Sequence, residues 1–400
     1  MHAIQHLRQY PMPLWALACY LLSLGFNFPV DAPLAIFLAI GIYSLLIRFQ
    51  WDNWQRVLVS HWPVILFLIS SLVSTLFSVN ISHSLRVQPQ LLSALVIYAV
   101  ISCYVTDNQR FDFIVAVLLL SAGLIALSVL IPGVRKGDAY SLVNLYATNS
   151  PIITVPNDLL LLSMLVPFAL MFLRLDGGTG WQRGCAVTFL LLAFVCIIFF
   201  QSRIALTVYC LACMFFIKWN RPFRVFGLLS GLLISGLLLD HVFFEGRMAS
   251  KIFMFPRFYV WKTAWTMFLD DMLVGKGPGM FRELYFHYLG EAGYVLEKLG
   301  DRREMPWAHN LFLELMAERG IIGLTSFSML IVHPVKRLLQ KLGKLPMDAC
   351  RAKREFAILI VFLTLFVGGL VEISLLRLWV ITFLFIFIAL ASALENIDIE

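Results

Sequence analysis

The main pattern along the chain is a series of long apolar runs separated by short polar connections. A run of about 20 apolar residues is long enough to cross the hydrocarbon core of a bilayer as an α-helix. The runs fall near residues 14–29, 33–47, 62–79, 90–105, 113–131, 157–173, 185–201, 203–217, 225–239, 309–332, 356–372 and 378–394. This pattern predicts an all-α polytopic integral membrane protein with about 12 transmembrane helices. The runs 185–201 and 203–217 are either two spans or one broken helix.

One connection breaks the pattern, because a single long segment separates the ninth and tenth runs. Within it, aromatic and apolar residues recur at helical spacing from about 257 to 270, which predicts an amphipathic helix against the membrane surface or the bundle. The glycine-rich stretch 275–279 ends this helix, and a second helical stretch is expected over 280–298. The chain therefore divides into transmembrane helices 1–9 at residues 1–239, a large loop at 240–308, and transmembrane helices 10–12 at 309–400.

The amino-acid composition agrees with a membrane protein. Of the 400 residues, 60% are hydrophobic and 14% are charged, whereas an ordinary soluble domain carries about 25% charged residues. The mean hydropathy is +0.85. The net charge of +7 is spread over short connections rather than gathered on one basic face, which argues against nucleic-acid binding.

Lysine and arginine are distributed unequally between the two sets of short connections. One set carries most of them, including those of the connection 333–355. The opposite set holds only Arg86, Arg135, Lys136, Arg203 and Arg377. The positive-inside rule makes the first set cytoplasmic, and long loops escape this rule. Both termini are therefore expected in the cytoplasm, and the large loop on the external side.

Polar side chains beside the apolar runs are functional candidates, because placing them in lipid is costly. The sharpest case is Gln201-Ser202-Arg203, at the external joint between two runs. An arginine costs roughly 2.5–3.5 kcal/mol at the bilayer centre, so Arg203 is expected to face the bundle interior or a wet cavity. A membrane anchor is the alternative. Arg257 opens the amphipathic helix on the same side, and two guanidinium groups suit the binding of phosphate oxygens through paired donors.

A histidine stands at the boundary between the large loop and the tenth run. Pro306-Trp307-Ala308-His309 leads into an apolar stretch, and this pattern predicts His309 on the first turn of a helix at the water–lipid boundary. The positive end of the helix dipole disfavours a charged imidazolium there. A neutral imidazole can accept a proton from a hydroxyl group. An interfacial or capping role for His309 is the alternative.

Further polar residues lie on the external side. Glu372, near the end of the eleventh run, and Arg377 are expected to form a structural pair or part of a substrate site. Arg86 and Asn310 are kept as candidate supporting positions.

Two acidic stretches have simpler interpretations. Asn157-Asp158 follows Pro156 and is expected to cap the sixth span, with a contact to sugar as the alternative. Asp270-Asp271 is expected to be the solvated end of the loop helix. We find no residue cluster with the spacing of a metal site.

Three motifs occur in order along the second half of the chain. They are Gln201-Ser202-Arg203-Ile204-Ala205-Leu206; Arg257-Phe258-Tyr259-Val260-Trp261 with the turn Gly275-Lys276-Gly277-Pro278-Gly279; and His309-Asn310-Leu311-Phe312 with Gly320-Ile321-Ile322-Gly323. In this order and topology they resemble the O-antigen ligase and polymerase superfamily of bacterial envelope glycosyltransferases. The resemblance covers about 185–330.

The resemblance implies a GT-C-like fold and an inverting glycosyltransferase that needs no metal and no other cofactor. It implies a donor glycan linked to undecaprenyl diphosphate, an acceptor hydroxyl on lipid A-core, and a periplasmic site in the bacterial inner membrane. Membrane lipids would be its other partners, with no nucleic acid. On this resemblance His309 is the general base, and Arg203 and Arg257 hold the diphosphate. The candidate supporting residues are Arg86, Asn157, Asn310, Glu372 and Arg377, of which Glu372 matches an acidic position of some ligases.

Two other functions stay open at this point. A polymerase shares the donor, the fold and the motifs of a ligase, and differs in using another lipid-linked glycan as acceptor. A transporter of polysaccharide or lipid-linked glycan would also explain twelve helices, but it would place polar residues near mid-span rather than at the external ends. We prefer the ligase.

Overall fold

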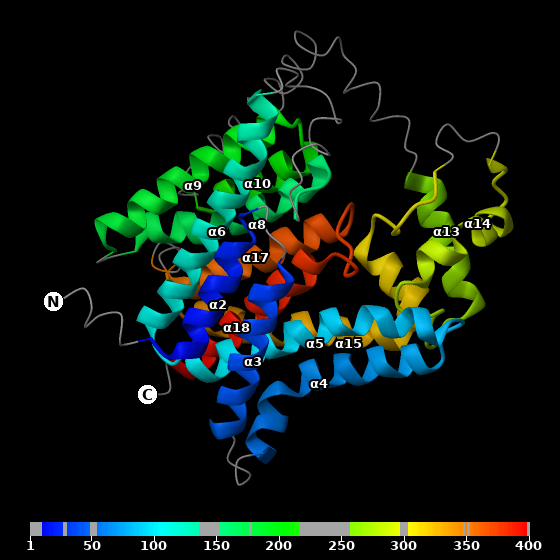
Figure 1. Ribbon diagram of the computed structural model, residues 1–400, viewed down its shortest axis with the longest axis horizontal. Coiled ribbons are helices and arrows are strands. Elements are labelled where there is room, and N and C mark those ends of the chain that lie inside the picture. Colours follow the sequence, from blue (N-terminus) through cyan, green and yellow to red (C-terminus); the bar gives the residue numbers. More distant parts are fainter. Residues whose placement is uncertain are drawn as a thin grey trace.

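The computed structural model describes residues 10–26, 30–48, 54–135, 152–175, 178–216, 257–296, 303–346, 349 and 353–397. In these ranges every regular element is a helix (Figure 1). The elements are α2 (Met12–Ser23), α3 (Asp31–Arg48), α4 (Trp54–Leu76), α5 (Ile81–Tyr104), α6 (Asn108–Arg135), the 3-10 helix η2 (Pro156–Leu159), α8 (Leu160–Arg174), α9 (Gly180–Phe199), α10 (Arg203–Phe216), α13 (Arg257–Asp270), α14 (Met280–Glu291), α15 (Leu311–Leu342), α17 (Arg354–Gly369) and α18 (Leu378–Ile397).

The helices follow the predicted apolar runs. Only the run 225–239 lies outside the described residues, and each of the others coincides with a helix. Six helices of the described part are long and apolar enough to cross a membrane, and four more are shorter apolar helices. The runs 185–201 and 203–217 are two helices, α9 and α10. The fold class is therefore confirmed as a helical polytopic membrane protein, while the total of 12 spans stays a prediction.

Helix α18 is strongly apolar and occupies the middle of the bundle (Figure 1). It contacts α5, α6, α15 and α17, and its side chains are almost all buried. A helix that is apolar on every side is stable only where neighbours or lipid cover it. The turn that precedes α18, at residues 370–377, is thereby fixed at one end of the bundle.

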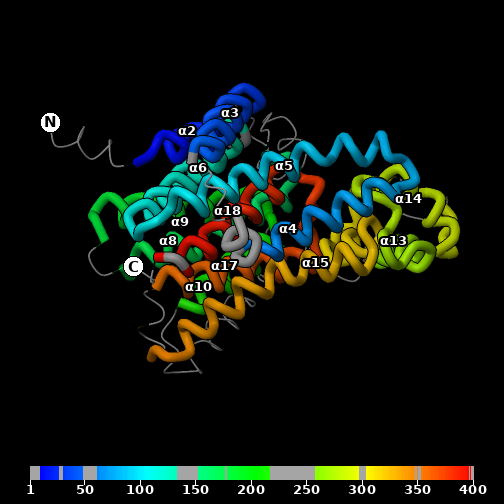
Figure 2. Tube along the Cα trace, turned by 90° about the horizontal axis from the view of Figure 1, so that it is seen from below, coloured from blue at the N-terminus to red at the C-terminus, as the bar shows by residue number. Residues whose placement is uncertain are grey.

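The long helix α15 packs along α4, and Figure 2 shows the two side by side. The Ser70 and Ser326 hydroxyls are 2.7 Å apart across this contact. The end of α15 lies beside the end of α18, where Lys341 Nζ donates to the Leu394 carbonyl at 2.8 Å. The beginning of α15 instead contacts α13 of the large loop. The loop helices and the basic connection 333–355 thus lie at opposite ends of α15, which agrees with the predicted orientation.

The large loop has a small core of its own. α13 begins and ends where the sequence predicted, whereas the second loop helix, α14, ends at Glu291 and not near 298. Apolar side chains from both helices pack together, including Val260, Met267, Phe281 and Tyr285. The predicted solvated end of α13 is partly paired, because exposed Asp270 forms an ion pair of 2.7 Å with Lys276.

A glycine turn joins the loop to α15. Gly320 interrupts α15 with a φ of 62°, which releases backbone groups on both sides of the break. The N–H of Ile321 donates to the Met272 carbonyl at 2.8 Å, and the N–H of Gly277 donates to the Glu318 carbonyl at 2.8 Å. Buried backbone polar groups need such partners. The glycine turn 275–279 of the loop and the glycine stretch 320–323 of α15 therefore pack against each other.

Candidate functional site

Glu372 lies in the turn after α17, which ends at Gly369, earlier than the predicted run 356–372. Its side chain is 1% exposed. Both carboxylate oxygens lie near Nδ1 of His309, at 3.1 and 3.2 Å. One oxygen accepts from Arg257 Nη2 at 2.9 Å, and the other from Arg377 Nη2 at 3.4 Å. The predicted pair of Glu372 and Arg377 is confirmed as part of a larger cluster.

The prediction that His309 lies on the first turn of a helix is wrong. α15 begins at Leu311, and Asn310 is its N-cap: Asn310 Oδ1 accepts from the N–H groups of Phe312 and Leu313, each at 3.0 Å. His309 precedes the cap with a φ of 51°. A left-handed conformation is uncommon for a residue with a side chain and is often found at functional sites. It turns the imidazole toward Glu372 instead of along the helix.

Arg257, the first residue of α13, connects the large loop to this turn. Besides its bond to Glu372, its Nη1 donates to the Val371 carbonyl at 2.6 Å. The side chain is 28% exposed. Arg257 therefore holds the turn from the loop side and remains accessible to solvent.

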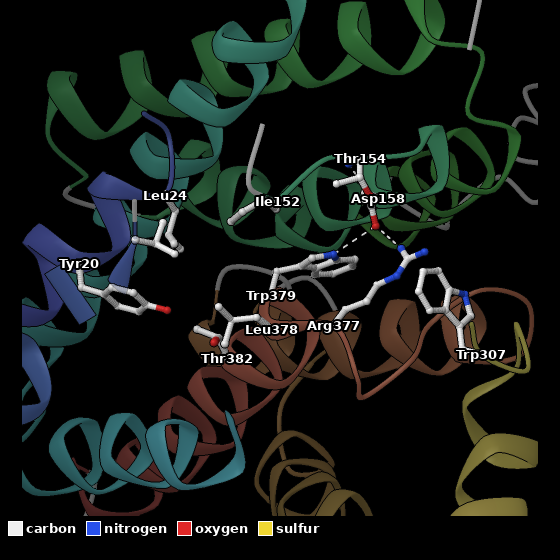
Figure 3. Close-up of a pocket in the computed structure, with 11 residues that line it drawn as sticks. Tyr20, Leu24, Ile152, Thr154, Asp158, Trp307, Arg377, Leu378, Trp379 and Thr382 are labelled. Carbon is white, nitrogen blue, oxygen red and sulfur yellow. Dashed lines mark hydrogen bonds and ion pairs between the residues drawn. The ribbon is translucent and has the colours of Figure 1, made fainter. Parts of the chain in front are cut away.

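Arg377 joins the turn to η2 (Figure 3). Its guanidinium forms an ion pair with Asp158, which is 1% exposed, and its Cζ lies 4.0 Å above the ring of Trp307. The Trp307 ring in turn meets the ring of His309 edge-on, with centroids 5.8 Å apart. Arg377 thus contacts the neighbours of His309 on two sides, through Glu372 and through Trp307.

Two further residues fix the turn that carries Glu372. Asn310 Nδ2 donates to the Leu370 carbonyl at 2.9 Å. The Ser374 hydroxyl and the Leu375 N–H donate to Oε1 of Glu314, at 2.7 and 3.2 Å. The turn is therefore tied to the first turns of α15, which also position His309.

The electrostatics of the cluster determine which imidazole nitrogen carries a proton. Burial alone would raise the pKa of Glu372, but the hydrogen bond with His309 and the neighbouring positive charges lower it below its ordinary value of 4.5. An ionised carboxylate only accepts hydrogen bonds, so Nδ1 of His309 is the donor. In neutral imidazole the other nitrogen, Nε2, then has a free lone pair. Two carboxylates, Glu372 and Asp158, balance two guanidinium groups, those of Arg257 and Arg377.

Arg203 lies at the same end of the bundle as this cluster. It is the first residue of α10 and its side chain is exposed. The next turn of α10 packs on α8 just after η2, since the Ser163 hydroxyl donates to the Ala205 carbonyl at 2.7 Å. Gln201, two residues before Arg203, has a φ of 55°. His309 is likewise left-handed and lies two residues before the first residue of α15.

Two of the predicted supporting residues, Arg86 and Asn157, lie outside the cluster. Arg86 is exposed on α5, and no hydrogen bond of the described residues joins it to the cluster. Asn157 is half-buried in η2, and the capping role expected of Asn157-Asp158 falls to Asp158, whose Oδ2 accepts from the N–H groups of Thr154 and Val155 at 2.8 and 3.0 Å.

Sequence reasoning missed three residues of this region. Asp158 was expected as a cap, with a contact to sugar as the alternative, and Trp307 was not singled out. Glu314 was missed although a carboxylate within an apolar run is a signal in itself, because such groups are buried only where they have partners.

A cavity of about 210 Å³ adjoins the cluster (Figure 3). Trp307, Arg377 and Asp158 line the side next to the cluster, and the rest of the lining includes Leu24, just after α2, and Leu378 of α18.

Comparison with known families finds a similarity in the middle of the chain. Residues 188–328 match the model of a family described as O-antigen ligase. This segment is therefore similar to the O-antigen ligase family. The match includes Arg203, Arg257 and His309, whereas Glu372, Arg377 and Asp158 lie outside it. No curated protein matches the chain. The matched segment thus contains three of the predicted site residues, and Glu372, which bonds His309 and Arg257, lies outside it.

Proposed function

We propose that the protein is an inverting glycosyltransferase of the ligase type. It transfers O-antigen polysaccharide from undecaprenyl diphosphate to a sugar hydroxyl of lipid A-core, at the periplasmic face of the inner membrane. The superfamily of residues 188–328 supports glycosyl transfer of the O-antigen ligase or polymerase kind.

One observation carries the proposal: His309 is held by a buried carboxylate through Nδ1. A histidine oriented in this way presents Nε2 as a base, by the logic of the hydrolase triads in which a carboxylate fixes the tautomer and the orientation of the ring. The bond from Nδ1 to Glu372 is 3.1 Å, and His309 is partly exposed at 21% of its side-chain surface. The nitrogen that would act as base can therefore meet a substrate hydroxyl.

The reaction is a single displacement. As the acceptor oxygen forms its bond to the anomeric carbon of the donor sugar, its proton passes to Nε2 of His309. The bond between that carbon and the diphosphate oxygen breaks, and undecaprenyl diphosphate leaves with the electron pair. Attack from the face opposite the leaving group inverts the anomeric configuration.

The arginines are assigned to the leaving diphosphate. Arg257 uses two of its donors on Glu372 and Val371, and a guanidinium group has five, so further donors remain for phosphate oxygens. Arg203 is exposed at the same end of the bundle. Their positive charges would stabilise the negative charge that develops on the diphosphate as the bond breaks.

The test is a gene deletion followed by analysis of the glycan on its lipid carrier. The proposal expects full-length polysaccharide to accumulate on undecaprenyl diphosphate, and lipid A-core to lack it. Accumulation of single repeat units would instead indicate a polymerase. Normal amounts of polysaccharide on lipid A-core after deletion would contradict both.

A further inference from the structure

Asp158 has more partners than a helix cap requires. Its Oδ2 accepts from the N–H groups of Thr154 and Val155, and from the Thr154 hydroxyl at 3.0 Å, which satisfies the cap of η2. Its Oδ1 is used differently, since it accepts from the Arg377 guanidinium and from Trp379 Nε1 at 3.2 Å (Figure 3). One oxygen therefore serves the local turn, and the other holds residues more than 200 positions away.

The long-range contact leads to His309 by two routes. Arg377, held by Asp158, bonds Glu372 at 3.4 Å, and Glu372 bonds the imidazole. The same guanidinium stacks on Trp307, whose ring touches the imidazole edge-on. Both routes pass through Arg377, and its side chain is only 8% exposed. A buried guanidinium has few alternative positions, so the carboxylate that fixes it also fixes what it contacts.

We infer that Asp158 is a positioning residue of the reaction centre, which acts on His309 through Arg377. The inference rests on the proposed function, because it concerns the orientation of the base in that reaction. Asp158 does not touch the reacting atoms. It keeps Arg377 shared between two carboxylates, so that Glu372 stays free to hold Nδ1 of His309.

The informative substitution is Asp158→Asn, which keeps the size of the side chain and an oxygen for the cap but removes the charge. Arg377 then has a single carboxylate partner, Glu372, and is expected to draw it away from the imidazole. A misplacement of about 1 Å at a reaction centre typically costs about a hundredfold in rate. We expect the transfer rate at saturating donor to fall by about that factor, while binding of undecaprenyl diphosphate, used as the probe, stays near that of the wild type.

The control is Thr154→Val, which removes a side-chain bond to Asp158 but leaves its charge and Arg377 in place. We expect normal transfer and normal donor binding. Purified full-length protein is used throughout, and its folded fraction is measured for each variant.

A double-mutant cycle with Arg377→Gln tests whether Asp158 acts through Arg377. The double variant Asp158→Asn/Arg377→Gln loses one charge of each sign and keeps the cluster balanced, so it remains informative even when Asp158→Asn alone fails to fold. The inference expects the double variant to transfer glycan at the rate of Arg377→Gln alone. Losses that multiply, or an Asp158→Asn variant with wild-type transfer, would overturn it. Absence of transfer by the wild type would instead refute the proposed function.

Discussion

Glu372→Gln changes the cluster by one charge and almost no volume. The amide can donate a hydrogen bond to Nδ1 of His309, which favours the tautomer with the proton on Nε2. That tautomer cannot accept a proton from the acceptor hydroxyl. The substitution also removes the carboxylate partner of Arg257, whereas Arg377 keeps its ion pair with Asp158.

The magnitude follows from the geometry. The equivalent carboxylate-to-amide change in serine hydrolases lowers kcat by about 10⁴. In this protein the carboxylate is shared with two arginines and its bond to His309 is 3.1 Å, so we expect a smaller loss, of about a thousandfold. That factor corresponds to about 4 kcal/mol of transition-state stabilisation, at 1.36 kcal/mol for each tenfold change.

The assay is transfer of glycan from purified undecaprenyl-diphosphate donor to lipid A-core in detergent or vesicles. Glu395→Gln is the matched control, because Glu395 also pairs with an arginine, Arg337, but at the other end of α18. The control should transfer normally. A Glu372→Gln protein that is folded, binds donor and transfers at the wild-type rate would refute the assignment of Glu372 as the orienting carboxylate.

Three further outcomes are expected. Arg203→Lys and Arg257→Lys should each lower turnover, by up to about a hundred- to thousandfold, because lysine cannot reproduce paired donors to a diphosphate. Normal turnover at normal protein levels would reassign Arg203 to membrane anchoring and leave Arg257 with a structural role in the turn of Glu372. Gly320→Ala should lower the unfolding temperature, since a Cβ would lie 2.2 Å from the Leu273 carbonyl oxygen. A backbone with φ 62° and ψ −166° is also essentially restricted to glycine, and holding another residue there costs on the order of 1–3 kcal/mol. An unchanged unfolding temperature would contradict the interlocked turn. Because the pKa of Glu372 is lowered on folding, its contribution to stability is present above about pH 4.5 and is lost as the pH falls below that value; thermal unfolding measured against pH should show this loss in the wild type but not in Glu372→Gln.

Local patterns predicted the helices well. The aromatic spacing of residues 257–270 predicted the bounds of α13, because apolar residues of an amphipathic helix recur with the helical period. The start of α15 was missed because apolar periodicity does not distinguish a helical His309 from a left-handed residue before an Asn310 cap. The capping bonds of Asn310, which satisfy two N–H groups, decide the boundary.

The cluster itself could be predicted only in part. Arginine and histidine side chains indicated phosphate binding for Arg257 and proton acceptance for His309. Their positions beside predicted spans placed both on the external side of the membrane. The cluster also needs Glu372 and Asp158, which are distant from His309 in sequence. Glu372 bonds His309 and Asp158 bonds Arg377 only once α17 and η2 have packed on α10 and α8. Spacing along a single sequence does not contain such contacts. From the sequence, Asp158 was therefore interpreted mainly by its local position, as a helix cap.

The most direct test of the account is the transfer activity and donor binding of His309→Ala, with His333→Ala as the control from the opposite part of α15. Loss of a positioned base typically costs about a hundred- to ten-thousandfold. His309→Ala should fold, bind undecaprenyl-diphosphate donor as the wild type does through Arg203 and Arg257, and transfer glycan slower by a factor in that range, while His333→Ala transfers normally. Near-normal transfer by His309→Ala, or a defect explained entirely by lost donor binding, would contradict the claim that His309 is the base.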